Sequence, residues 1–108
     1  LSMDEDFFEI DYFPQLTIIP LSSKAWIKTN MLSNKLRERN IAIVNSPSNK
    51  SFKSQMRYAN QIKSKYLMVV GNNELDNNEI ELKELSSGLV TKLKFDLEEI
   101  YSKLIENG

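Results

Sequence analysis

Three short apolar runs punctuate the first two thirds of the chain. They span residues 15–21, 40–44 and 66–70, and polar or turn-forming residues border each of them. Apolar runs of this length with β-branched residues are typical of strands that are buried on both faces. We therefore predict three buried strands at these positions, with Pro14 as the boundary before the first.

The two longer stretches between these strands have the spacing of amphipathic helices. The first begins at Ser22 or Ser23, either of which can cap a helix, and ends at about Arg39. The second covers roughly residues 49–63, and its apolar side chains lie within one arc of about 120°. The first stripe consists of Ala25, Thr29, Leu32 and Leu36, and the second of Phe52, Met56, Ala59 and Ile62. We expect both stripes to face the core.

The last third of the chain begins with the pattern of a β-hairpin. Ile80 and Leu82 alternate with charged residues, as in a half-buried strand. Residues 86–88 provide the hairpin loop, and the return strand covers residues 89–95. In residues 71–78 we expect a polar loop and a turn rather than a helix. The third buried strand then leads directly into the hairpin.

A final helix is predicted from Asp96 to Gly108, because Asp96 and Glu99 have capping-box spacing and the apolar residues that follow have helical spacing. The order of elements is then β-α-β-α-β-β-β-α. Strands joined through helices pair in parallel by right-handed crossovers. We therefore predict an α/β fold with a five-stranded mixed sheet, formed by three parallel strands plus a C-terminal antiparallel hairpin and covered by three helices.

Composition favours a binding function and leaves only carboxylate or lysine chemistry open. The chain has 108 residues, 41% of them hydrophobic and 27% charged, which is typical of one globular domain. No apolar run approaches the roughly 18 residues of a membrane span, so we expect no membrane partner. The chain has no histidine and no cysteine, so zinc sites, thiol nucleophiles and most catalytic triads are excluded. We expect no catalytic and no metal-binding residues.

Charge is segregated along the chain. Residues 1–11 hold five acids and no base, residues 12–73 hold ten bases and one acid, and residues 74–108 hold four bases and nine acids. The second predicted helix is free of acids, and three of its bases lie within an arc of about 60°. These are Lys50, Lys53 and Arg57. A solvated helix face and a polyanion-binding ridge both fit the pattern, but surface helices usually interleave Glu with Lys, so we favour the ridge.

Gly71 ends a buried strand, as glycines of phosphate-binding loops do. The dinucleotide fingerprint G-x-G-x-x-G and the P-loop G-x-x-x-x-G-K-[ST] are both absent. Because we expect no helix after Gly71, a helix N-terminus for an anion is missing as well. We therefore reject a phosphate pocket and expect Gly71 to supply a free φ angle. Glu74 is either a solvated loop acid or a ligand-facing residue, since the carboxyl ends of parallel strands are where such sheets bind ligands.

Four segments of the chain carry ordered motifs: LTIIPL, KLRERNIAIV, SFKSQMRYANQIKSKYLMVVGNNEL and EIELKELSSG. The pattern K-x-Q-x-x-x-A-[DN] is met by Lys53, Gln55, Ala59 and Asn60, and the block G-x-x-E-L by Gly71, Glu74 and Leu75. In this order and spacing the segments resemble the C-terminal anticodon-binding domain of class II aminoacyl-tRNA synthetases. Within that family they are most like the histidyl-tRNA synthetases. The resemblance covers roughly residues 15–105.

The resemblance implies an anticodon-binding domain in residues 14–108, behind a lead-in or linker of residues 1–13 that it does not cover. It implies the tRNA anticodon stem-loop as ligand and no cofactor in this domain. It also implies a catalytic domain outside this chain that uses ATP and Mg²⁺, in a cytoplasmic, homodimeric parent enzyme. Threonyl-, prolyl- and glycyl-tRNA synthetases carry sister domains. Those domains, a synthetase-like interaction or dimerisation module, and a small enzyme with Glu74 as base are the alternatives.

The resemblance further implies that Glu74 and the basic residue of the next strand, Lys83, face anticodon bases. We assign the basic side chains of the second predicted helix to contacts with backbone phosphates. Such contacts position a nucleic acid without specifying its sequence. Two asparagines would complete the contacts to base edges. The candidate tRNA-binding residues are Asn49, Lys50, Lys53, Arg57, Asn72, Glu74 and Lys83.

Overall fold

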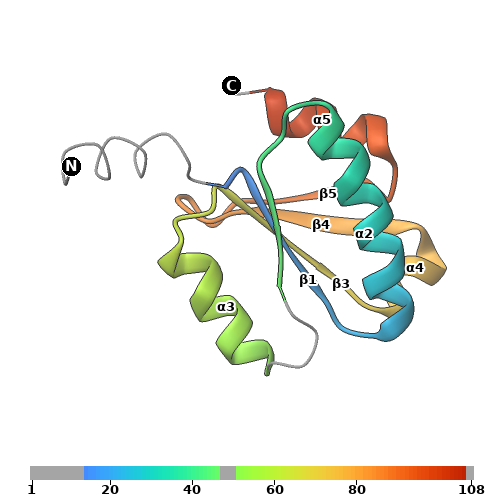
Figure 1. Ribbon diagram of the computed structural model, residues 1–108, viewed down its shortest axis with the longest axis horizontal. Coiled ribbons are helices and arrows are strands. Elements are labelled where there is room, and N and C mark those ends of the chain that lie inside the picture. The colour runs from blue at the N-terminus through green and yellow to red at the C-terminus, as the bar shows by residue number, and fades with distance from the viewer. Residues whose placement is uncertain (1–13, 47–50, 107–108) are drawn as a thin grey trace.

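The computed structural model describes residues 14–46 and 51–106, which form one five-stranded sheet with helices on both faces (Figure 1). The strand order is β2-β1-β3-β4-β5. β1 pairs in parallel with β2 and β3, whereas β4 is antiparallel to both β3 and β5. The strands are β1 (Leu16–Pro20), β2 (Ile43–Asn45), β3 (Tyr66–Val70), β4 (Glu79–Glu84) and β5 (Val90–Lys94), and the helices are α2 (Ser23–Glu38), α3 (Phe52–Gln61), α4 (Asn72–Asn77) and α5 (Leu97–Ile105). The α/β class and the mixed five-stranded sheet are confirmed.

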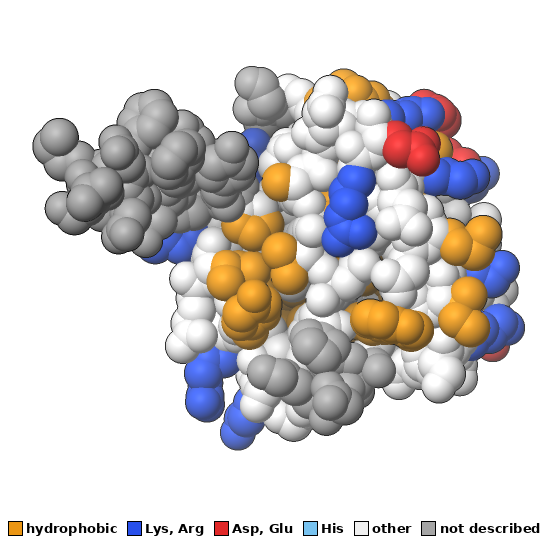
Figure 2. All heavy atoms as spheres, in the orientation of Figure 1, with side chains coloured by type: hydrophobic (Ala, Val, Ile, Leu, Met, Phe, Trp, Pro, Cys, Tyr) orange, Lys and Arg blue, Asp and Glu red, His pale blue; other side chains and the backbone are white. Residues whose placement is uncertain are grey.

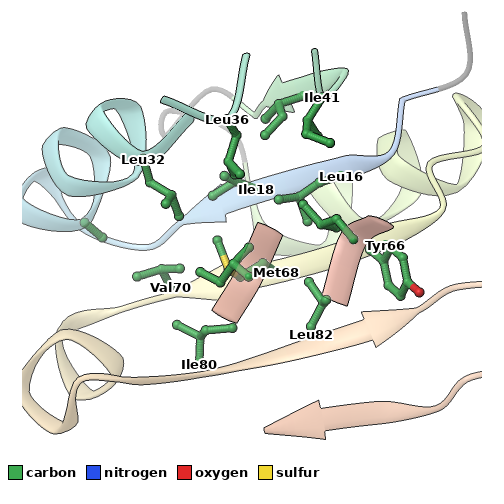
Figure 3. Packing of buried hydrophobic residues seen from close by; sticks show 14 residues of the cluster. Leu16, Ile18, Leu32, Leu36, Ile41, Tyr66, Met68, Val70, Ile80 and Leu82 are labelled. Carbon is green, nitrogen blue, oxygen red and sulfur yellow. The ribbon is translucent and has the colours of Figure 1, made fainter. Parts of the chain in front are cut away.

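The larger core lies between the sheet and the helices α2 and α5. Alternate residues of the strands point to this face, because successive side chains of a strand point to opposite faces. Figure 3 shows Leu16, Ile18, Met68 and Ile80 converging on this side. The predicted stripe of α2 is buried here in full, together with Ile100 and Leu104 of α5. These helices therefore close one face of the sheet.

The smaller core lies under α3 on the opposite face. It consists of Ile19, Ala59 and Leu67, with Met56 and Val69 packed against it. The central strands β1 and β3 contribute here the residues that alternate with those of the larger core. α3 therefore covers the middle of this face, over β1 and β3.

The predicted core stripe of α3 is partly wrong. Phe52 is 49% exposed, whereas Gln55, which the stripe left out, is 2% exposed. The helix turns the Gln55 and Ala59 side toward the sheet, so Phe52 lies at the edge of the contact. A one-dimensional apolar stripe does not record how far a sheet extends on either side of the helix that covers it.

A short helix, α4, stands where the sequence predicted a polar loop and a turn. It starts directly after Gly71 and ends at Asn78, which is left-handed with φ 53°. Because the segment is rich in Asn and only six residues long, propensity favours a turn and the helical period is hardly visible. The helix count is therefore four in the described residues, not three, and the third strand does not lead directly into the hairpin.

Half of the α3 face of the sheet is left without a helix. In the part of the chain that the structure describes, β4 and β5 lie beyond α3 in the strand order, and α2 and α5 pack on the other face. Ile80 and Leu82 of β4 point into the larger core, so the residues between them point to the open side. The fold thus exposes one face of the hairpin beside α3.

Candidate nucleic-acid interface

A groove of about 410 Å³ lies on this open face, between α3 and the hairpin. Its floor is apolar and comes from the inner strands, with Leu67 and Val69 of β3. One wall is the side of α3 that carries Phe52 and Met56. The remaining lining residues are Leu21, Glu74, Asn77, Glu79, Ile80, Glu81, Lys83, Val90 and Lys92. The groove therefore combines apolar surface with charged side chains from three separate elements.

The charged side chains of the groove are available to a ligand. Glu81 of β4 lies opposite Lys92 of β5 in the strand register, and Lys83 lies opposite Val90. None of the groove's acids or lysines forms an ion pair with another residue that the structure describes; the ion pairs Arg39–Glu98 and Lys103–Glu106 lie elsewhere. Charged acceptors and donors outside ion pairs and side by side are what contacts to base edges require.

Glu74 is fixed in place by the backbone. One of its carboxylate oxygens, Oε1, accepts a hydrogen bond from the backbone N–H of Gly71 at 2.6 Å. This is the backward half of a capping box, in which the third residue of a helix satisfies a free N–H at its start. In the described part of the chain no group donates a hydrogen bond to the second oxygen, Oε2. Glu74 is therefore both a helix cap and a half-buried acceptor at the groove, and the interpretation as a solvated loop acid is wrong.

The explanation of Gly71 by a free φ angle is also wrong. Its φ is −119° and its ψ is −171°, an extended conformation that any residue adopts. The constraint is space, since a Cβ atom there would lie 3.1 Å from Glu74 Oε1 and 3.3 Å from a Leu21 methyl carbon. A helix does follow Gly71, which removes one reason for rejecting a phosphate there. However, the carboxylate of Glu74 already holds the N–H at the start of this short helix, so an incoming phosphate would meet a negative charge.

The candidate cations of α3 lie outside the groove. Lys53 and Arg57 are exposed, and the helix places them about 100° further round than Phe52 and Met56. No acid occurs between residues 51 and 73, so this helix and its surroundings form a positive flank. Figure 2 shows Lys and Arg side chains projecting from the α3 region, whereas acids gather near α5. Asn49 and Lys50 lie outside the described residues.

Of the remaining candidate residues, one lines the groove and one lies outside it. Lys83 lies on β4 and lines the groove, as Glu74 does. Asn72 is exposed at the first turn of α4, where its Oδ1 accepts a hydrogen bond from Ser22 Oγ at 2.8 Å, and it does not line the groove. The structure therefore brings Glu74 and Lys83 together and leaves Asn72 at a separate position near the start of α2.

Several groove residues were missed at the level of sequence. Glu79, Glu81 and Lys92 lie on the strands of the hairpin, and Phe52 was assigned to the core. The alternation along the hairpin already places its charged residues opposite Ile80, away from the core. The alternation could have identified these charged residues as groove residues if it had been known which side of the sheet is open. The K-x-Q-x-x-x-A pattern, in contrast, includes Gln55 and Ala59, which are buried packing residues.

The described residues hold no group of three His, Cys, Asp or Glu side chains that could bind a metal ion. Among the same residues, every helix is too short or too polar to cross a bilayer.

Comparison with known proteins places this geometry in a family. The family described as "Anticodon binding domain" matches residues 15–107. A histidine–tRNA ligase from Protochlamydia amoebophila is 41% identical over 83 residues, which cover 77% of this chain and 20% of that protein. A histidine–tRNA ligase from Ruthia magnifica is 37% identical over 98 residues, covering 87% of this chain and 23% of that protein. The chain thus spans about a fifth of the length of the curated relatives it matches.

Solved structures give the same picture at the level of the fold. Apo histidyl-tRNA synthetase from S. aureus superimposes with a TM-score of 0.77 at 27% identity, over 81% of this chain and 26% of that one. The RNA-binding domain of threonyl-tRNA synthetase from Cryptosporidium parvum gives a TM-score of 0.76 at 17% identity, over 90% of this chain and 25% of that one. At that identity the second likeness concerns the fold alone.

Proposed function

The chain belongs to the anticodon-binding domain family, and on that premise we propose that it is the anticodon-binding domain of a histidyl-tRNA synthetase. The observation that carries the proposal is the open half-face of the sheet beside an acid-free helix. A single-stranded loop needs apolar surface for its bases, donors and acceptors for their edges, and cations for its phosphates. The groove supplies the first two and the flank of α3 supplies the third.

In this proposal each charged group has a distinct role. Glu74 accepts from a base amino or imino group through the carboxylate oxygen that the cap leaves open, and Lys83 donates to a base acceptor from the adjacent strand. Lys53 and Arg57, outside the groove, contact phosphates and hold the loop in register. Asn72, at the rim, and Asn49 and Lys50, outside the described residues, remain candidates for further contacts.

The parent enzyme follows from the same proposal. A catalytic domain outside this chain would use ATP and Mg²⁺ to charge the tRNA that this domain holds by its anticodon. We expect the parent to act in the cytoplasm as a homodimer. The domain itself would bind and position the tRNA, in line with a groove that lacks histidine and cysteine.

The direct test is a titration of the 108-residue chain with fluorescent RNA stem-loops. One stem-loop carries a histidine anticodon, and its controls differ from it at a single anticodon base. We expect tighter binding of the histidine stem-loop, with an affinity that falls as salt rises because phosphate contacts release counterions. Equal affinity for all stem-loops would contradict an anticodon-specific domain, and no binding at low salt would contradict the proposed function as a whole.

A further inference from the structure

The position of Phe52 is unusual for a phenylalanine in the first turn of a covering helix. Its side chain is 49% exposed and lines the groove together with Met56, which follows one helical turn later. α3 packs on the sheet through Gln55 and Ala59 instead. The smaller core beside the groove does not include Phe52. The fold therefore leaves an aromatic ring at the mouth of the groove.

From this position we infer that Phe52 is a stacking platform for one unstacked base of the anticodon loop. The inference deepens the proposed function and rests on it. An aromatic ring beside a polar groove offers a π-face to a base, while the groove contacts the edges of that base or of its neighbour. The apolar floor of Leu67 and Val69 continues the surface on which bases can lie.

The charges around the ring determine which part of an RNA can lie there. Three carboxylates, those of Glu74, Glu79 and Glu81, line the groove together with two lysines, Lys83 and Lys92, so its interior attracts phosphates less than the acid-free flank of α3 does. Lys53 follows Phe52 in the helix and projects from the outer side of α3. A nucleotide that stacks on the ring thus has its base over the groove and its phosphate beside a lysine. The arrangement fits a splayed single-stranded nucleotide and does not fit a stacked duplex, whose bases are covered.

The test compares Phe52→Leu with Phe52→Tyr in the 108-residue chain. Leucine keeps apolar volume without a π-face, whereas tyrosine keeps the ring. We expect Phe52→Leu to weaken binding of the histidine stem-loop by roughly 5- to 100-fold, as for the loss of one stacked base, and Phe52→Tyr to bind within about 2-fold of the unchanged chain. Because the side chain is half exposed, both variants should fold, which the thermal midpoint verifies.

A second arm identifies the stacked base. Stem-loops with an abasic nucleotide at each loop position in turn are titrated against the unchanged chain and Phe52→Leu. We expect one position at which removal of the base makes the two proteins bind equally, and an unchanged salt dependence of Phe52→Leu. If the unchanged chain binds but Phe52→Leu binds equally well, or no position shows coupling, the platform is refuted while the proposed function stands. If the unchanged chain binds no stem-loop, both fall together.

Discussion

Glu74 Oε1 lies 2.6 Å from the backbone nitrogen of Gly71, so one carboxylate both starts α4 and faces the groove. The helix that the carboxylate caps is also the element that holds it over the hairpin. The rigidity of an acceptor matters for specificity, because a base without the matching donor leaves a half-buried acceptor unpaired. In the proposed function, capping and base recognition would thus be coupled in a single side chain.

Two substitutions at Glu74 should separate these roles. Glutamine can still accept from the Gly71 N–H, so Glu74→Gln should keep stability while it reduces discrimination between the histidine stem-loop and its single-base variants. Glu74→Ala should lose both, with a cost of about 0.5–1 kcal/mol in unfolding free energy from the missing cap. Urea denaturation and RNA titration measure the two effects. Equal discrimination by all three proteins would remove Glu74 from base recognition.

The flank of α3 should control affinity rather than specificity. We expect Lys53→Ala and Arg57→Ala each to weaken binding of every stem-loop by a similar factor and to reduce the slope of log affinity against log salt by about 0.7 per lost phosphate contact. Lys28→Ala is the matched control, since Lys28 is an exposed lysine on α2, which covers the other face of the sheet. A slope that responds equally to all three substitutions would indicate non-specific attraction rather than a defined ridge.

The pair Arg39–Glu98 should make stability sensitive to acid. Arg39 donates two hydrogen bonds to the Glu98 carboxylate, at 2.6 and 3.0 Å, and its guanidinium carbon lies 4.8 Å from the centre of the Tyr101 ring. The hydrogen bonds lower the pKa of Glu98. A carboxyl with a lower pKa in the folded state stabilises the fold at neutral pH and loses that contribution as pH falls through the folded pKa, below the ordinary value of about 4.3.

For this pair we predict that the unchanged chain is more stable to urea than Glu98→Gln at neutral pH, and that this difference in stability disappears on acidification. At pH 7 the urea midpoint of Glu98→Gln should lie below that of the unchanged chain, and the gap should close as pH falls from the ordinary pKa of about 4.3 through the lower folded pKa of Glu98. Glu99→Gln, one residue along the same helix and outside any ion pair in the described residues, should show no such convergence. A gap between Glu98→Gln and the unchanged chain that persisted at low pH would point to packing rather than charge.

Arg37 should protect the exposed edge of the sheet. Its Nη2 donates to the carbonyl oxygen of Ile43 in β2 at 3.1 Å, and β2 is an edge strand of three residues. We expect Arg37→Ala to lower the unfolding free energy by about 0.5–1 kcal/mol and to increase aggregation on warming, because an uncovered edge can pair with another chain. Light scattering against temperature measures the second effect. Lys35→Ala, an exposed position on the same helix with no hydrogen bond to β2 among the described residues, should scatter like the unchanged chain.

The sequence predicts the core-forming helices and strands well because their buried residues recur with the regular spacing of a helix or a strand. The stripe of α2, with Ala25, Leu32 and Leu36, and the strands β1 and β3 are set by local spacing, and all of these residues except the half-buried Val69 are buried in the structure. The five-stranded mixed sheet follows from the order of these elements. Such features depend on residues close in the chain and on general rules of chain connection.

The features that the sequence failed to predict depend on distant parts of the chain. Phe52 fits an apolar stripe, but its exposure depends on how far β4 and β5 extend beyond α3. α4 is too short for periodicity, although Gly71 and Glu74 have the three-residue spacing that would have identified its start. Glu74 and Lys83 both line the groove, whereas Asn72 lies outside it, because its position follows from the start of that unexpected helix.

The alternation along the hairpin has a consequence for how such a domain can change. Ile80 and Leu82 fill the core while Glu79, Glu81 and Lys83 line the groove, so neighbouring positions of one strand contribute to different surfaces. A substitution at an outward position alters the ligand surface and leaves the packing beneath untouched. The surface of the groove can therefore be altered through alternate residues of two strands while the packing of the larger core is kept.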